Sequence, residues 1–147
     1  MKRADKIENK RIFKSTTTAL SEVRQFVEDN ALSFGFGEKE VSEITLAVDE
    51  ACTNVIKHAY QSDPNFEFEV RITAGGIEFQ VVVRDWGAGF KPEEVPVPNI
   101  KGKIGRHKAG GLGIFLMRKL MDSVEFQGRE TMNEVRLVRY LKNEPKP

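Results

Sequence analysis

Glu50 and Asn54 stand four residues apart within the stretch DEACTNVIKHAY, residues 49–60. In a helix this spacing places the two side chains one turn apart on the same face. At about 100° per residue, that face points away from the apolar side of the helix. The apolar side comprises Val41, Ile44, Val48, Cys52, Val55 and Ala59. A carboxylate can accept a proton from a nucleophile and an amide oxygen can ligate Mg²⁺, although a solvated surface shows the same spacing.

A second candidate is the stretch VVVRDWGAGF, residues 81–90, which ends an apolar strand with an acid and two alternate glycines. Asp85 can accept a hydrogen bond from the exocyclic amine of a base. Gly87 and Gly89 allow a ligand to approach the backbone closely, but a plain glycine-rich turn would look the same. A dinucleotide fingerprint is excluded because Pro92 stands where the third glycine would be needed.

The third candidate is the start of a helix in KAGGLGIFLMRKLMD, residues 108–122. Gly110, Gly111, Leu112 and Gly113 lie where the first backbone N–H groups are unpaired and carry the positive end of the helix dipole. The cations just upstream are Arg106, His107 and Lys108. Such a helix terminus can hold a polyphosphate, and the alternative is that the glycines only permit tight helix packing.

The elements that must position these groups follow from hydrophobic periodicity. We expect a short strand around Ile12 and Phe13, after a charged leader, and a helix from Ser15 or Thr16 to about Leu32. The remaining elements are a helix over 38–60, a hairpin of strands 66–74 and 77–85, a helix over 111–122, and strands within 123–130 and 133–141. This order predicts a two-layer α/β (α+β) sandwich, a mostly antiparallel sheet with helices on one face.

The chain has 147 residues, which is enough for a single domain with a real core. We expect one domain over 1–147, flexible ends at about 1–9 and 143–147, and a lid over about 91–110. Lys and Arg total 23 against 22 Asp and Glu, so no global charge attracts nucleic acid. With one cysteine, Cys52, and no run of eighteen apolar residues, we expect a cytoplasmic protein without a disulfide or membrane span.

In the order ExxxN, DxGxG and GGLG, the three candidates resemble the boxes of the GHKL ATPase superfamily, whose members share the Bergerat nucleotide-binding fold. Within it the chain is most similar to anti-sigma factor serine/threonine kinases of the RsbW and SpoIIAB type. The phrases that carry this likeness are ITLAVDEACTNVIKHAY, VVVRDWGAGFKPEEVP and GGLGIFLMRKLMD. The likeness extends from about residue 10 to residue 142.

The resemblance implies ATP bound with Mg²⁺ and phosphoryl transfer to a serine or threonine of a small anti-anti-sigma (STAS-type) partner. A sigma factor would be a second partner, and dimerisation is common in that family. By position, Glu50 would be the general base, Asn54 the Mg²⁺ ligand and Asp85 the reader of the adenine amino group. Arg106 and Lys108 would meet the phosphates.

The chain departs from the family at one place. Many members carry a Gly-Thr pair before the last strand, whereas this chain has MNEV, so Asn133 would have to take the place of the threonine. His58 is either a support for the metal shell or a surface histidine. Three alternatives stay open: a nucleotide-binding module that sequesters a partner without turnover, a stand-alone histidine-kinase-like ATPase domain, and a plain α/β domain whose glycines only make turns.

Overall fold

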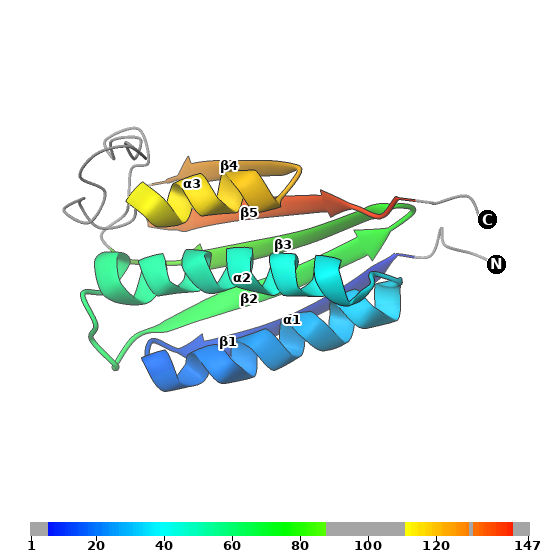
Figure 1. Ribbon diagram of the computed structural model, residues 1–147. Helices are drawn as coiled ribbons and strands as arrows, with labels where there is room; N and C mark the ends of the chain where they lie inside the picture. Colours follow the sequence, from blue (N-terminus) through cyan, green and yellow to red (C-terminus); the bar gives the residue numbers. More distant parts are fainter. Residues whose placement is uncertain (1–5, 88–110, 130, 143–147) are drawn as a thin grey trace, which may run out of the picture.

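The computed structural model describes residues 6–87, 111–129 and 131–142. Five strands form one antiparallel sheet in the order β1-β2-β3-β5-β4, and the helices cover one of its faces (Figure 1). The strands are β1 Ile7–Lys14, β2 Glu67–Gly75, β3 Glu78–Asp85, β4 Ser123–Gly128 and β5 Asn133–Tyr140. The α-helices are α1 Leu20–Phe34, α2 Glu38–Asn54 and α3 Gly111–Leu120, with a 3₁₀ turn η1 at Thr17–Ala19 and a π-helix η2 at Val55–Ala59. The predicted α+β sandwich is confirmed.

The core lies between the sheet and the helices. Residues of β2 and β3 alternate between the two faces, and those under the helices are fully buried. These are Phe68, Val70 and Ile72 on β2 and Phe79, Val81 and Val83 on β3. On the other face, Glu69 forms ion pairs with Arg71 at 3.1 Å and with Arg84 at 3.9 Å. The two strands pair with Val70 opposite Val83 and Gly75 opposite Glu78, so the turn falls at Gly76 and Ile77, one residue later than the strands expected over 66–74 and 77–85 place it.

β1 is longer than the short strand expected around Ile12 and Phe13. It begins at Ile7 and pairs with β2 over eight residues, so part of the charged leader belongs to the sheet. Backbone hydrogen bonds to β2 hold this edge strand, and they do not depend on apolar side chains. At its other end the chain turns into α1, where Thr16 Oγ1 accepts the N–H of Ala19 at 3.3 Å.

α2 is buried on two sides. The apolar side predicted from the helical wheel is buried as expected. Ala47 and Ala51, outside that apolar side, are 0 and 2% exposed, and α3 packs against α2. Asp49 points sideways toward α1, where its carboxylate binds Arg24 at 2.8 Å. The face carrying Glu50 and Asn54 is therefore partly enclosed between α2 and α3.

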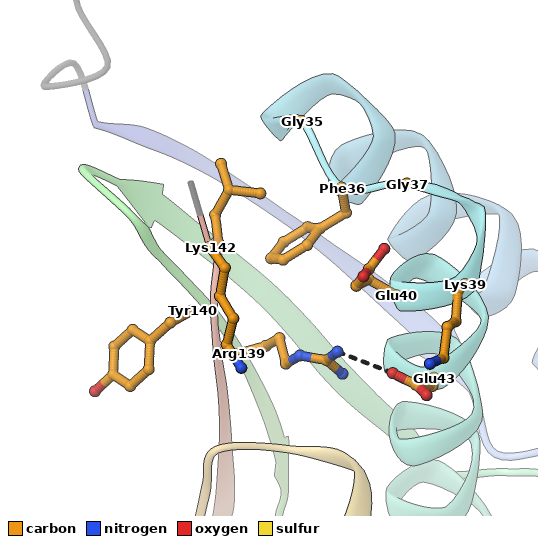
Figure 2. Close-up of a pocket in the computed structure, with 10 residues that line it drawn as sticks. Gly35, Phe36, Gly37, Lys39, Glu40, Glu43, Arg139, Tyr140 and Lys142 are labelled. Atoms are coloured by element: carbon orange, nitrogen blue, oxygen red, sulfur yellow. Dashed lines mark hydrogen bonds and ion pairs between the residues drawn. The ribbon is translucent and has the colours of Figure 1, made fainter. Parts of the chain in front are cut away.

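Arg139 of β5 ties this arrangement together at the far end of α3. Its Nη1 donates to the carbonyl of Leu120, the last residue of α3, and its Nη2 binds Glu43 of α2, both at 2.8 Å. Figure 2 shows the guanidinium directed at Glu43. A cation at a helix C-terminus also interacts favourably with the helix dipole.

Replacing Arg139 with methionine should lower the free energy of unfolding by about 1–3 kcal/mol, because a part-buried carbonyl and carboxylate lose a charged donor. Urea unfolding followed by circular dichroism measures the change. The matched control is Arg136→Met, since Arg136 is more exposed and meets Glu125 at 3.6 Å, and it should change stability by less than about 0.5 kcal/mol. Equal losses of stability in the two variants would contradict a stabilising role for the contacts of Arg139 with Leu120 and Glu43.

Candidate functional site

The three sequence motifs meet at one end of the molecule. The C-terminal end of α2, the end of β3 and the start of α3 all lie on the left of Figure 1. A Cβ added at Gly113, in the first turn of α3, would lie 2.8 Å from Glu50 Oε1. A Cβ added at Gly87, after β3, would lie 2.6 Å from the carbonyl oxygen of Ala59, at the end of η2. Because these two residues are glycines, the start of α3 packs closely against Glu50, and the turn after β3 packs closely against the end of η2.

Glu50 presents a half-buried carboxylate to the start of α3. Burial raises the pKa of Glu50, and the neighbouring charge of Asp49 raises it further, whereas Lys57 lowers it. A carboxylate with a raised pKa is a better proton acceptor than an ordinary surface glutamate. The position and the electrostatics therefore fit a general base.

Asn54, the last residue of α2, is 8% exposed. Its Nδ2 is buried and has no hydrogen-bond partner among the described residues. Buried side-chain amides are normally satisfied, so this NH₂ group is available to donate a hydrogen bond to a ligand. Its oxygen is of the kind that Mg²⁺ prefers, and Asn54 therefore fits a hard cation.

The helix changes type directly after Asn54. In η2 the hydrogen bonds run over five residues, as in the 2.9 Å bond from the N–H of Tyr60 to the carbonyl of Val55. Single π-turns of this kind are frequent at functional sites. The sequence predicts a continuous helix over 38–60, and it does not reveal this turn. His58 lies in η2, and burial and then Lys57 lower its pKa, which favours the neutral imidazole.

Asp85 closes β3 and is 5% exposed. Its Oδ1 accepts two hydrogen bonds, from Gly87 N at 2.9 Å and from Asn133 Nδ2 at 3.0 Å. Burial raises the pKa of this carboxyl, and the two hydrogen bonds partly oppose the shift. Asn133 is the register partner of Asp85 across the sheet, so the residue that stands in the place of the family's threonine lies beside the carboxylate.

Tyr60 is a contributor that the sequence pattern did not single out. Its hydroxyl accepts the N–H of Trp86 at 2.9 Å and donates to the carbonyl of Glu67 at 2.7 Å. Its ring stacks on Phe66 with centroids 4.7 Å apart. The sequence feature that could have identified Tyr60 is an aromatic residue with a polar tip at the end of a buried helix. Such a residue usually finds a hydrogen-bond partner. Tyr60 joins η2 to the turn that follows Asp85.

Gly87→Ala should weaken ATP binding at least tenfold and lower stability by about 1–3 kcal/mol, since the new methyl would collide with backbone on η2. Isothermal titration calorimetry with ATP and Mg²⁺, together with urea unfolding, measures both effects. Gly76→Asn is the control, because Gly76 has φ +59° and open space around it, which asparagine tolerates. Normal ATP binding by Gly87→Ala would show that this close approach is not needed.

Several predicted site residues lie outside the described residues. They are Gly89, Arg106, Lys108 and Gly110, together with the lid expected over 91–110. Gly111 and Leu112 are the first two residues of α3, and Leu112 is 49% exposed. The structure thus brings together Glu50, Gly113 and the motif around Asp85 and leaves the predicted phosphate contacts of the lid as predictions.

A separate hollow of about 400 Å³ lies at the opposite end of α2 (Figure 2). It is lined by Gly35, Phe36, Gly37, Lys39, Glu40, Glu43, Arg139, Tyr140, Leu141 and Lys142. The α2 residues that line this hollow, Lys39 to Glu43, lie about 17–23 Å along the helix from Asn54. None of the motif residues lines it, and it is distinct from the candidate site.

In the described part of the chain, no group of three or more His, Cys, Asp or Glu side chains could hold a metal ion. A cation at the candidate site would therefore need oxygens from a ligand beside that of Asn54, as Mg²⁺ in nucleotide sites commonly has. Among the same residues, no helix is long and apolar enough to cross a membrane.

The family model described as histidine kinase-like ATPase domain matches residues 13–139, and the chain belongs to this family. The GHKL resemblance of the three boxes is thereby confirmed. Its curated relatives include the serine-protein kinase RsbW of Bacillus subtilis strain 168, 31% identical over 83% of this chain and 78% of that protein. RsbW of Bacillus thuringiensis strain Al Hakam is 30% identical over 98% of this chain and 90% of that protein.

Solved structures share the fold at low sequence identity. The RsbU and RsbW domains of Rv1364c from Mycobacterium tuberculosis superpose with a TM-score of 0.65 at 14% identity, over 94% of this chain. The present chain spans about a third of that longer protein, 33%. The SiaB-SiaC complex from Pseudomonas aeruginosa gives a TM-score of 0.59 at 12% identity, over 88% of each chain.

Proposed function

We propose that this protein is an ATP- and Mg²⁺-dependent serine/threonine protein kinase that acts as an anti-sigma factor and phosphorylates an anti-anti-sigma partner. The observation that carries the proposal is that Gly113 at the start of α3 lies against Glu50, while Gly87, which donates to Asp85, lies against the end of η2 at the same end of the molecule (Figure 1). The RsbW relatives, which are named serine-protein kinases, support the reaction class.

In this proposal each group has one task. Asp85 accepts a hydrogen bond from the adenine amine, and the N–H groups at the start of α3 hold phosphate oxygens. Asn54 would hold Mg²⁺, which would supply positive charge to neutralise the phosphates. Glu50 accepts the proton of the substrate hydroxyl while the oxygen of that hydroxyl bonds to the γ-phosphorus. The bond from that phosphorus to the bridging oxygen breaks, and ADP leaves.

The remaining assignments complete the proposal. Gly87, Gly89, Gly110, Gly111, Leu112 and Gly113 shape the nucleotide site, and Arg106 and Lys108 meet the phosphates from a lid over about 91–110. Residues 1–147 act as one kinase domain in the cytoplasm, with a sigma factor as the second partner and with the capacity to form a homodimer. Neither nucleic acid nor a membrane takes part directly.

The test is phosphoryl transfer to an identified partner. Partners captured from a lysate of the source cells with ATP, and then with ADP, are identified by mass spectrometry. A captured STAS-type protein is purified and incubated with the kinase, ATP and Mg²⁺. We expect one phosphoserine or phosphothreonine per partner molecule and release of ADP. Tight binding with no phosphate transfer at long times would instead favour a sequestering module.

A further inference from the structure

Tyr60 connects three segments that are distant in the sequence. It is 4% exposed, and its hydroxyl donates to the carbonyl of Glu67, at the start of β2, at 2.7 Å. The same hydroxyl accepts the N–H of Trp86 at 2.9 Å. A hydroxyl is both a donor and an acceptor, so one phenol serves both backbone groups. The end of η2 is therefore fixed to the sheet and to the turn after β3.

The ring of Tyr60 supports the same turn. A Cβ added at Gly87 would lie 3.0 Å from Cδ1 of the ring, so the backbone of Gly87 packs directly on it. The ring is itself held by Phe66, with centroids 4.7 Å apart and ring planes only 6° apart. Hydroxyl and ring together thus hold Trp86 and Gly87, the two residues that follow Asp85.

The backbone directly after Tyr60 is strained. Gln61 and Ser62 have φ of +51° and +62°, in the left-handed region that residues other than glycine rarely adopt. The surrounding structure holds them there, since the N–H of Ser62 donates to the carbonyl of Ile56 at 2.7 Å and that of Asp63 to the carbonyl of Tyr60 at 2.9 Å. Strain of this kind persists where a fixed placement serves function, and here it fixes the place of Tyr60.

The turn held by Tyr60 carries the N–H that orients Asp85. Gly87 N donates to Oδ1 of Asp85 at 2.9 Å, and Trp86 stands between them. The peptide group that joins Asp85 to Trp86 cannot rotate without breaking the hydrogen bond to Tyr60. Tyr60 in turn stands six residues after Asn54, at the end of the helix that carries the first motif. It therefore sets where the second motif lies relative to the first.

We propose that Tyr60 is a positioning residue for nucleotide binding: its hydroxyl holds the turn after Asp85 in place relative to α2, and the affinity for ATP depends on that turn. The inference rests on the proposed function, because it takes the turn to be part of the nucleotide site. Burial raises the pKa of Tyr60, whereas the hydrogen bond from Trp86 lowers it. The phenol keeps its proton at neutral pH and with it both hydrogen bonds.

The experiment compares Tyr60→Phe with Tyr140→Phe, a change at the other tyrosine of the chain, which is 41% exposed and lines the separate hollow. Each substitution removes one hydroxyl and keeps the ring. Kd values for ATP and for ADP, each with Mg²⁺, are measured by titration calorimetry. We expect Tyr60→Phe to weaken both nucleotides by about the same factor, about tenfold, because the turn contacts a part that ATP and ADP share. Tyr140→Phe should change neither Kd by more than about twofold.

A second measurement separates positioning from a general loss of stability. Arg139→Met is expected to destabilise the protein away from the turn, and it should leave both Kd values within about twofold of wild type. Hydrogen exchange of the Trp86 amide, followed by NMR, should be about tenfold faster in Tyr60→Phe and unchanged relative to other amides in Arg139→Met. Only a role at the turn predicts this difference between the two variants.

The outcomes distinguish the inference from the function on which it depends. Unchanged ATP affinity in folded Tyr60→Phe overturns the inference and leaves the kinase proposal standing. An equal loss of affinity in Arg139→Met also overturns it, since stability alone would then explain the effect. Failure of the wild-type protein to bind ATP overturns both. If Tyr60→Phe does not fold by circular dichroism, Phe66→Leu replaces it: the stacked ring is lost, the hydroxyl remains, and ATP binding should weaken about threefold. Unchanged affinity in Phe66→Leu would then overturn the inference.

Discussion

Glu50→Gln is expected to reduce phosphoryl transfer to the partner by about 10²–10⁴-fold while ATP binding stays within about threefold of wild type. Glutamine keeps the size and position of the side chain beside Gly113, but it cannot accept the proton of the attacking hydroxyl. The measurement is a single-turnover assay with labelled ATP and the purified partner, alongside calorimetry for ATP. Loss of rate without loss of binding is the signature of a group that acts in the transition state.

Asp49→Asn is the matched control, because it alters the neighbouring carboxylate that binds Arg24 and faces α1. Its rate at neutral pH should stay within about threefold of wild type. The charge of Asp49 raises the pKa of Glu50, so removing that charge should lower the pKa of Glu50. As the pH is decreased, the rate of Asp49→Asn should therefore begin to fall at a lower pH than the wild-type rate. An undiminished rate in Glu50→Gln, or an equal fall in Asp49→Asn, would remove Glu50 from the role of base.

Asp85→Asn is expected to weaken ATP binding by about 10²-fold or more and to leave the protein at least as stable as wild type. The carboxamide oxygen can accept the bonds from Gly87 and Asn133, which places its NH₂ where Oδ2 was. A donor then faces the adenine amine, and a site built to accept a hydrogen bond rejects such a pairing strongly. Calorimetry with ATP gives the affinity, and urea unfolding gives the stability.

The stability half of this prediction follows from the sign of the pKa shift. Burial raises the pKa of Asp85 in the folded protein, so ionising the group at neutral pH opposes folding, and a neutral amide removes that cost. Asp122→Asn is the control, since Asp122 also accepts a backbone N–H, from Tyr140, but lies exposed and away from the motifs. Unchanged ATP affinity in Asp85→Asn would exclude Asp85 as the reader of the base.

Local patterns in the sequence were sufficient for most elements. Strands β2 and β3 follow from alternation, and the turn expected at Gly75 and Gly76 lies one residue later, at Gly76 and Ile77, where Gly76 has φ +59°. The buried side of α2 follows from its 3.6-residue period. The three motifs and their order identified the family, and the match over residues 13–139 confirms it. These features depend on residues close together in the chain, whose preferences can be read without the rest of the molecule.

The enclosure of the site was decided by tertiary structure alone. Packing of α3 against α2 accompanies the burial of Ala47 and Ala51. Asn54 is buried as well, and its amide nitrogen has no hydrogen-bond partner within the described residues. The sheet register brings Asn133 within 3.0 Å of Asp85, 48 residues earlier in the chain. The sequence by itself thus determined the strands, the helical faces and the chemical groups of the site. Which groups touch was decided by strand register and helix packing, because no local preference encodes a contact between distant segments.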